Sequence, residues 1–218
     1  MGRRAALLFL VLEGAVYAAF LAMDLAGLGG LSIWPKYAGV LLCAAFACRC
    51  ALRGGDRLVL PALALTALAD LFLLVLNRHY GVGVAIFLAV QTLYLIRLRR
   101  AGAGVALWLR LTLALALGVA VYLGRLASPL NLLVCLYFSQ LLANACLAWT
   151  VRGRRWRAFA LGLTLFVGCD VCVGIFNLPG LLPDALYQFS RIGMWLFYLP
   201  SQALIALSAL PEEKESSP

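Results

Sequence analysis

The feature that most constrains this chain is a series of long apolar segments separated by short polar connections. A helix rises about 1.5 Å per residue and the hydrocarbon core of a bilayer is about 30 Å thick, so about 20 apolar residues cross it. Eight segments come close to that length: 5–23, 34–52, 58–76, 79–96, 105–124, 130–151, 158–176 and 187–210. Only 12% of the residues are charged, against about 25% in soluble domains. We therefore expect an all-α, polytopic transmembrane bundle of about eight helices. It forms a single domain over residues 1–210, followed by a disordered polar tail at 211–218.

Basic residues are distributed unevenly among the connections. Thirteen of the 18 Lys and Arg residues lie at the N-terminus, in the connections 49–57, 97–100 and 152–157, and in the C-terminal tail. The alternate connections hold only Lys36, Arg78, Arg125 and Arg191, while Arg110 lies inside the fifth segment. This alternation is the positive-inside pattern, and it predicts that both termini are cytoplasmic. Topology thus explains the net charge of +9. We exclude a nucleic-acid partner and expect a multi-pass integral membrane protein, in the plasma membrane if the source is bacterial.

The seven cysteines favour neither a disulfide framework nor a metal site. Their number is odd, and all of them lie in or next to apolar segments. The "CDVC" sequence at 169–172 has no second Cys pair and no nearby His. Packing of small residues between helices is the better interpretation, and we expect no metal.

Two apolar segments each carry one aspartate that is followed seven residues later by an asparagine. The pairs are Asp70 with Asn77 and Asp170 with Asn177, so they lie 100 residues apart. The same offset aligns Tyr37 with Tyr137 and Arg57 with Arg157. Two parallel four-helix repeats would explain these matches. The alternative is chance combined with similar helix spacing.

The two aspartates are expected at the same depth in the membrane. Each comes twelve residues after its segment begins, which is about 18 Å from the inner edge and in the outer half. A single membrane Asp can act as a hydrogen-bonding group between helices, but two at matched depth favour a shared polar pocket. Two nearby carboxyls in a low dielectric do not both ionise, so one keeps its proton. An acid–base hydrolase needs this arrangement.

Other polar side chains could line the same pocket. Tyr198 and Gln202 lie one turn apart around Pro200, which should kink the last helix or free a carbonyl. Lys36 and Arg191 lie at the outer ends of the second and eighth segments, where a lipid phosphate would be met, although such residues can simply snorkel. The remaining intramembrane candidates are Glu13, Gln91, Tyr94, Tyr137, Gln140 and Asn144.

With these residues, the chain resembles the YhhN-type lysoplasmalogenase family. "LGLTLFVGCDVCVGIFN" followed by "FYLPSQALIAL" is similar to the family's ending, "ALADLFLLVLN" to its first Asp motif, and "PKYAGVLL" to its early Lys segment. The chain departs from the family pattern at three positions. Ala69 replaces a Gly before the first Asp, Cys169 replaces a Ser before the second, and Gln91 stands where a His is usual near Tyr94.

The resemblance implies an eight-helix membrane enzyme that hydrolyses the vinyl-ether bond of lysoplasmalogen to a fatty aldehyde and a glycerophospho-alcohol. Asp70 and Asp170 would be its catalytic acid and base, with no metal, nucleotide or other cofactor. The expected substrate-binding residues are Lys36, Asn77, Tyr137, Asn177, Arg191, Tyr198 and Gln202. The expected partners are the lysophospholipid substrate and the bilayer. Two alternatives are a proton- or cation-coupled transporter, in which the aspartates relay the ion, and a non-catalytic lipid-binding relative, which the absent His favours.

Overall fold

The computed structural model describes residues 3–178, 180 and 182–211. Every regular element in this part of the chain is helical. The elements are α1 (Arg3–Leu25), α2 (Gly29–Leu52), α3 (Val59–Asp70) with its π-helical continuation η1 (Leu71–Val75), α4 (Tyr80–Arg100), α5 (Leu107–Leu123), α6 (Pro129–Ala148), α7 (Arg154–Phe176) and α8 (Asp184–Leu207). The predicted all-α fold of eight helices is confirmed. The predicted polar tail, apart from Pro211, lies outside the described residues.

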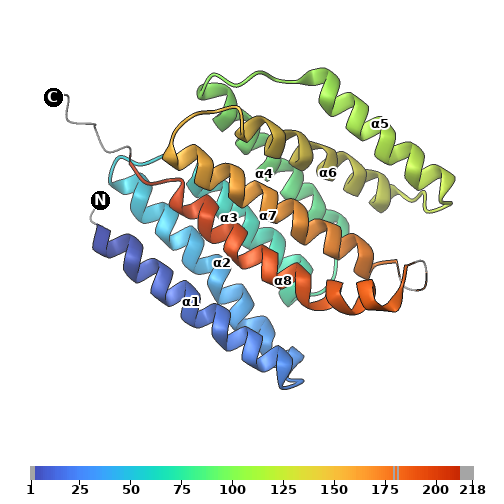
Figure 1. The fold of residues 1–218 in the computed structure, drawn as a ribbon, viewed down its shortest axis with the longest axis horizontal. Helices are drawn as coiled ribbons and strands as arrows, with labels where there is room; N and C mark the ends of the chain where they lie inside the picture. The colour runs from blue at the N-terminus through green and yellow to red at the C-terminus, as the bar shows by residue number, and fades with distance from the viewer. Residues whose placement is uncertain (1–2, 179, 181, 212–218) are drawn as a thin grey trace.

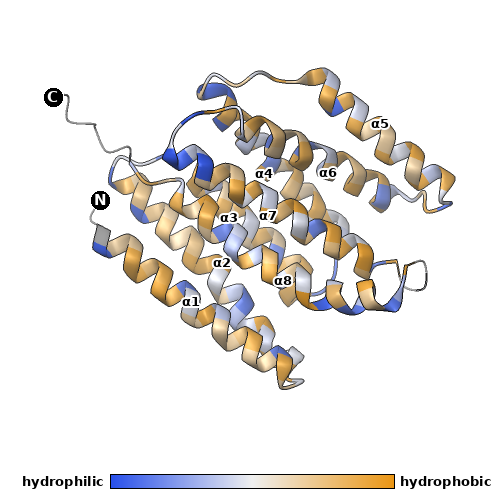
Figure 2. Cartoon of the chain, viewed as in Figure 1, coloured by the Kyte–Doolittle hydropathy of each residue, from blue (hydrophilic) through white to orange (hydrophobic). Residues whose placement is uncertain are grey.

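Several of these helices have the length and composition of membrane spans. Five are long and apolar enough to cross a bilayer, and they are α1, α2, α4, α6 and α7. The segments Val59–Val75 and Leu107–Leu123 are apolar but shorter. Figure 2 shows that the middle of the bundle is predominantly hydrophobic. Large apolar side chains such as Leu8, Trp108 and Leu115 remain exposed, which a soluble monomer rarely tolerates over so wide an area. The bundle is therefore membrane-like.

The helices of the two halves have corresponding neighbours. Within each half, consecutive helices pack together, from α1 to α4 and from α5 to α8. Between the halves, α2 contacts α8 and α6 contacts α4, which are equivalent pairs under a shift of four helices. Figure 1 shows α1 and α5 at opposite edges of the bundle. Two parallel four-helix repeats would produce this arrangement.

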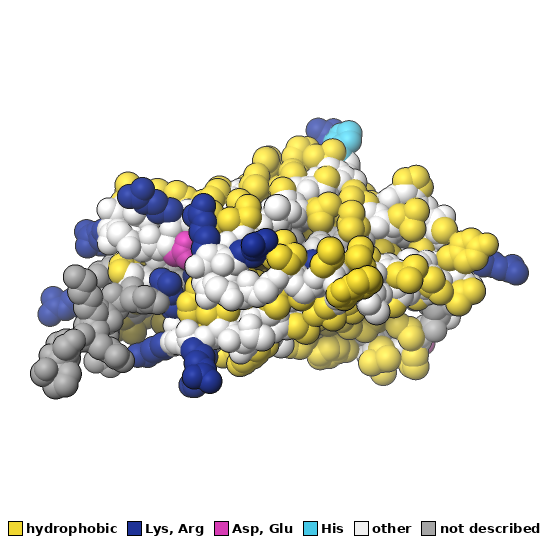
Figure 3. Space-filling model, turned by 90° about the horizontal axis from the view of Figure 1, so that it is seen from above, with side chains coloured by type: hydrophobic (Ala, Val, Ile, Leu, Met, Phe, Trp, Pro, Cys, Tyr) yellow, Lys and Arg dark blue, Asp and Glu magenta, His cyan; other side chains and the backbone are white. Residues whose placement is uncertain are grey.

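Most basic residues collect at one end of the bundle, which we call the basic end. The start of α1, the end of α8 and the connections 53–58, 101–106 and 149–153 all lie there (Figure 1). Figure 3 shows Lys and Arg side chains concentrated at the same end, with few on the hydrophobic middle. The charge alternation along the sequence therefore becomes a separation in space. That the basic end is cytoplasmic stays a prediction.

The first Asp helix changes its winding at the aspartate itself. Asp70 is the last residue of α3, and in η1 the Leu76 N–H donates to the Leu71 carbonyl at 2.8 Å, a five-residue step. A π-helical turn rotates every following side chain relative to an α-helix, and Asn77 then leaves the helix at a φ of 48°. Asn77, although seven residues after Asp70, therefore does not continue the helix face on which Asp70 lies. The second Asp helix, α7, runs unbroken from Arg154 to Phe176.

Candidate active site

Asp70 lies at the junction of α3 and η1 and faces α8. Its Oδ2 accepts a hydrogen bond of 2.6 Å from the hydroxyl of Tyr198, and both side chains are buried. Pro200 lies inside α8 and has no N–H to donate to the Leu196 carbonyl four residues earlier. That carbonyl instead faces the hydroxyl of Tyr17 on α1, at the long distance of 3.5 Å. The proline therefore frees a carbonyl, as the sequence predicts, and α1 takes part in positioning this stretch of α8.

Asp170 has an equivalent partner on a different helix. Its Oδ2 accepts a hydrogen bond of 2.6 Å from the hydroxyl of Tyr137 on α6. Tyr137 is buried, whereas Asp170 is partly exposed. Each intramembrane aspartate thus receives one phenolic hydroxyl, which satisfies part of the demand of a carboxyl group removed from water. Of the two aspartates, Asp170 is the more accessible.

The two Asp–Tyr pairs belong to one cluster, although they come from four different helices. Asp70 and Asp170 lie close enough to interact electrostatically, and the hydroxyl of Tyr137 lies within the field of both. A row of aromatic rings connects the pairs, with centroid distances of 5.7 Å from Tyr137 to Phe87, 5.6 Å from Phe87 to Phe166 and 5.5 Å from Phe166 to Tyr198. We call Asp70, Tyr198, Asp170 and Tyr137 the Asp–Tyr cluster.

The Asp–Tyr cluster is suited to moving one proton. Two interacting carboxyls in a low-dielectric interior are most stable when only one of them is charged. Neutral phenols can donate to the charged form without adding a counter-ion that would fix both groups as carboxylates. The cluster can therefore present one carboxylic acid and one carboxylate within electrostatic range of each other, and general acid–base catalysis uses such a pair.

Lys36 is buried and does not reach outward as the sequence suggests. Its Nζ forms an ion pair of 2.7 Å with Asp24 Oδ2 and donates to Ser32 Oγ at 3.0 Å. The same Nζ lies 4.8 Å from the centroid of the Trp195 ring and 5.5 Å from that of Phe20. The ammonium group is therefore held between α1, α2 and α8, and simple snorkelling to the interface does not describe it.

Lys36 is linked to the Asp–Tyr cluster through one aromatic residue. The Trp195 ring, which covers the Lys36 ammonium, also packs edge-on against Tyr198 with centroids 5.6 Å apart. The positive charge of Lys36 thus lies one aromatic ring, that of Trp195, away from Tyr198 of the cluster. It lies on the side of the cluster away from the basic end. Gln202, one turn beyond Tyr198, is fully buried, and its Oε1 has no hydrogen-bond partner among the described residues.

Three other expected substrate-binding residues do not reach the cluster. Asn77 is exposed and accepts a 2.6 Å hydrogen bond from Tyr80, while Asn177 is exposed and donates to the Val173 carbonyl at the end of α7. Both asparagines therefore terminate their helices. Arg191 is exposed on α8, with a 3.4 Å contact to Gln188. The asparagines of the repeated Asp–Asn spacing thus lie at helix ends, away from the two aspartates.

Gln91, at the position where the family usually has His, takes part in a polar network between helices. Its Oε1 accepts from Asn144 Nδ2 at 3.0 Å, and Asn144 Oδ1 accepts from Arg110 at 2.6 Å. Arg110 also donates to Gln140 Oε1 at 2.5 Å. These contacts connect α4, α5 and α6. Glu13 is likewise buried outside the cluster, next to Gly39 of α2.

Sequence reasoning missed the residues whose role depends on helix adjacency. Asp24 and Trp195 complete the surroundings of Lys36, and the rings of Phe87 and Phe166 form the row that connects Tyr137 with Tyr198. One signal was available, because Asp24 and Lys36 flank the same short connection between two apolar segments. The aromatic residues gave no such signal, since aromatic side chains are common throughout the helices.

Comparison with known proteins identifies a family but no individual relative. The model of the YhhN family matches residues 31–209, a range that includes every helix after α1 almost completely. None of the curated proteins and none of the solved structures matches significantly.

Proposed function

The chain belongs to the YhhN family, whose model covers most of its length, and we propose that it is a lysoplasmalogenase of the membrane. The observation that carries this proposal is the Asp–Tyr cluster. Two carboxyls from distant parts of the sequence lie within electrostatic range of one another, and each accepts a hydrogen bond from one tyrosine. The resemblance of the motifs around both aspartates to those of the lysoplasmalogenases supplies the substrate.

In the proposed reaction, the protonated carboxyl of the pair donates its proton to the vinyl-ether carbon that lies beta to the oxygen. The electron pair of the double bond forms the new C–H bond, and an oxocarbenium ion remains. The ionised partner stabilises this cation and orients a water molecule, whose attack gives a hemiacetal and releases a proton to a carboxylate. The hemiacetal then collapses to the fatty aldehyde and the glycerophospho-alcohol. One water is consumed, the proton is returned, and the reaction as written uses no cofactor.

The environment of the pair supports distinct roles for the two aspartates. Asp70 is buried, whereas Asp170 is partly exposed and is therefore the more accessible of the two to an incoming lipid. Tyr137 and Tyr198 each fix one carboxylate oxygen, so the other oxygen of each carboxyl is left for substrate or water. Preorganised donors of this kind need little rearrangement as charge develops.

The proposed substrate is a one-chain phospholipid taken from the bilayer. Lys36 is a buried cation that packs against Trp195, the ring in contact with Tyr198, and it can meet the phosphate if the lipid displaces Asp24. The hydrocarbon chain attached through the vinyl ether would lie along the apolar helices. We propose a multi-pass location in the plasma membrane if the source is bacterial.

The test is to incubate the purified protein with lysoplasmalogen and to measure the fatty aldehyde that is released. Asp70→Asn and Asp170→Asn should each lower turnover by about 10²-fold or more, because each keeps the side-chain shape but removes proton exchange. Asp184→Asn, which removes an exposed carboxylate at the start of α8, is the matched control and should keep full activity. Near-wild-type turnover in either cluster variant, with its fold intact, would remove that aspartate from the mechanism.

A proton- or cation-coupled carrier is the second candidate, and one observation favours it. Carriers commonly have interrupted helices at their ion sites, and η1 interrupts α3 directly after Asp70. Against it, the other Asp helix, α7, is continuous. Proteoliposomes with a pH-sensitive dye inside separate the two functions, since a carrier moves protons without releasing aldehyde and a hydrolase does the reverse.

A further inference from the structure

A single carboxyl group lies in the middle of α1, apart from the Asp–Tyr cluster. Glu13 comes ten residues, or about 15 Å, after Arg3, so it lies near the centre of this 23-residue helix. Its side chain is only 5% exposed, whereas Leu8 and Val11 on the same helix are exposed. Among the described helices α1 contacts only α2 and α8, and Figure 1 shows it at the edge of the bundle. Glu13 therefore faces the interior from a helix whose other side faces lipid.

The carboxyl of Glu13 packs where α2 carries no side chain. A methyl group at Gly39 would lie 3.0 Å from Glu13 Oε1 and 2.8 Å from Leu199 Cδ2 of α8, closer than packed atoms normally come. The fully buried thiol of Cys43, one turn further along α2, interacts with the same carboxyl. The carboxyl thus lies between α2 and α8, beside a glycine, a thiol and a leucine.

No positive charge of the described residues neutralises Glu13. Neither of its carboxyl oxygens accepts a well-formed hydrogen bond from this part of the chain, and a thiol is only a weak donor. The nearest arginine along α1, Arg4, is nine residues or about 13 Å away at the basic end. The buried cations of the described residues bind other groups: Lys36 pairs with Asp24, Arg97 with Asp56, and Arg110 with Gln140 and Asn144.

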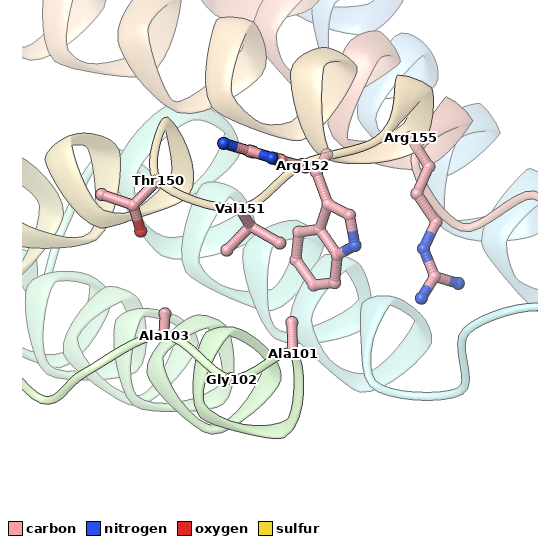
Figure 4. A pocket seen from close by; sticks show the side chains of 8 residues that line it. Ala101, Gly102, Ala103, Thr150, Val151, Arg152 and Arg155 are labelled. Carbon is pink, nitrogen blue, oxygen red and sulfur yellow. The ribbon is translucent and has the colours of Figure 1, made fainter.

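Phenols and water are also held away from Glu13. Tyr17 on α1 directs its hydroxyl to the Leu196 carbonyl, and Tyr198 on α8 donates to Asp70. A hollow of about 430 Å³ at the basic end lies between the α4–α5 and α6–α7 connections (Figure 4). Its lining residues all lie between positions 101 and 156, so none belongs to α1, α2 or α8. This hollow therefore gives water no route to Glu13.

From this combination we propose that Glu13 is a proton-binding site in the middle of the membrane. A carboxylate that is removed from water without a cation or strong donors is far less stable than the neutral acid. The ligand of the site is therefore one proton, held as a carboxylic acid between α1, α2 and α8. The bound proton lets α1 pack this polar residue against the other two helices, and Gly39 leaves the room for it.

A protonated carboxyl in lipid reacts with carbodiimides that dissolve in the bilayer. The acid proton moves to one nitrogen of the carbodiimide, and a carboxyl oxygen bonds to its central carbon. The acyl group then migrates to a nitrogen, because no water competes for it, and a stable N-acylurea remains. All atoms of both reactants are kept, and no oxidant or reductant takes part. Gly14 is exposed and an added Cβ there would meet nothing within 4 Å, so the approach from lipid is open.

The proposed site is separate from the proposed catalytic reaction. Asp70 and Asp170 lie on α3 and α7, and neither of these helices contacts α1. The match to the family model begins at residue 31, so Glu13 also lies outside the region that identifies the family. The site therefore stands whether or not the chain hydrolyses vinyl ethers.

The test treats the full chain in phosphatidylcholine nanodiscs with dicyclohexylcarbodiimide at pH 6 and maps the adducts by peptide mass spectrometry. Glu13 should be labelled at about tenfold or more the yield of Asp184, an exposed carboxyl at the start of α8, because an exposed carboxyl with a pKa of about 4 is ionised at this pH. Glu13→Gln keeps the shape of the neutral acid, so it should lose this adduct and keep the thermal midpoint of the wild type.

Infrared spectroscopy measures the proton without any reagent. At pH 6 the C=O band of protonated carboxyl groups should be weaker in Glu13→Gln than in the wild type, and Asp184→Asn should leave it unchanged. Equal bands in the wild type and Glu13→Gln would overturn the proposal, because Glu13 would then be a carboxylate. Labelling of Glu13 by a water-soluble carbodiimide as fast as by the bilayer-soluble one would place the carboxyl in water. Protection of Glu13 by sodium chloride but not by choline chloride would make the ligand a metal cation and not a proton.

Discussion

At the scale of single residues, the environment of each buried aspartate depends on a hydrogen-bond partner that is distant in sequence. The aspartates stand out in the sequence because carboxyls inside apolar segments are rare and costly. Their partners, Tyr198 and Tyr137, do not stand out in the sequence, because a tyrosine in a membrane protein is often only an anchor at the interface. Tyr198 is 128 positions from Asp70, and only the packing of α8 against α3 brings them together. The sequence therefore predicts the two aspartates. Which tyrosines donate hydrogen bonds to them is determined only by how the helices pack.

Lys36 provides a prediction at this scale, which rests on the proposed function. Asp24 holds one of the three N–H donors of Lys36, so it competes with a lipid phosphate for the same charge. Lys36→Ala should raise KM for lysoplasmalogen by about tenfold with a smaller effect on kcat, because phosphate contacts persist through the reaction. Asp24→Asn should lower KM, because the competitor loses its charge. Steady-state kinetics of both variants beside Asp184→Asn test this, and an unchanged KM in both would make the ion pair only an anchor for α1.

At the scale of elements, hydrophobic length predicts the helices well and their irregularities poorly. All eight predicted segments overlap the observed helices, because the bilayer requires about 20 apolar residues for each. The π-helical turn of η1 gave no signal, since no Pro or Gly lies between Leu71 and Val75. Pro200 did give one, and the freed Leu196 carbonyl follows from ring chemistry. A helix irregularity that a residue type such as proline causes can be predicted from the sequence. One that arises from helix packing, such as η1, cannot.

Helix α5 provides the element-scale prediction, because α6 is its only neighbour among the described elements. Arg110 joins the two by donating to Gln140 Oε1 and Asn144 Oδ1. Arg110→Leu leaves the buried Asn144 Oδ1 and the partly buried Gln140 Oε1 without that donor and should cost about 1–3 kcal/mol of unfolding free energy. Faster hydrogen exchange across α5 should accompany a lower thermal midpoint. Leu111→Ala, an exposed position on the same helix, is the control. Unchanged exchange in the Arg110 variant would show that apolar packing alone holds α5.

At the scale of the whole molecule, the arrangement of charge was more predictable than the arrangement of helices. Arginines alternate between connections, so an even number of spans places them at one end together with both terminal helix ends. The offset of 100 residues suggested two similar halves, and the matching neighbour pairs α2–α8 and α6–α4 agree with it. Which helices of the two halves would meet at the aspartates did not follow from the offset. The partners of Asp70 and Asp170 come from non-equivalent helices, α8 and α6.

The basic end also makes the stability of the whole bundle depend on pH. Asp56, in the connection between α2 and α3, accepts hydrogen bonds from Arg97 Nε at 2.7 Å and from the Leu58 N–H at 3.0 Å. Burial by itself raises the pKa of Asp56, but the charge and hydrogen bond of Arg97, the Leu58 N–H and the charge of Arg155 outweigh it, so the pKa is lowered. Because Arg97 also binds Ser208 after α8, this carboxylate links three parts of the chain.

The sign of the pH effect follows from the direction of that shift. A carboxyl with a lower pKa in the folded state stabilises the protein fully above the pKa of the unfolded chain, about 4, and this contribution is lost as the pH falls through the folded value. Asp56→Asn should therefore cost about 1–3 kcal/mol at pH 7, where a charge-assisted hydrogen bond is lost. Its thermal midpoint should fall less steeply than that of the wild type between pH 5 and about pH 2. Thermal unfolding in detergent across this range measures both effects, with Asp184→Asn as an exposed-carboxylate control. If the wild type and Asp56→Asn lost stability in parallel on acidification, the acid sensitivity would come from other carboxyls and Asp56 would not hold the basic end together.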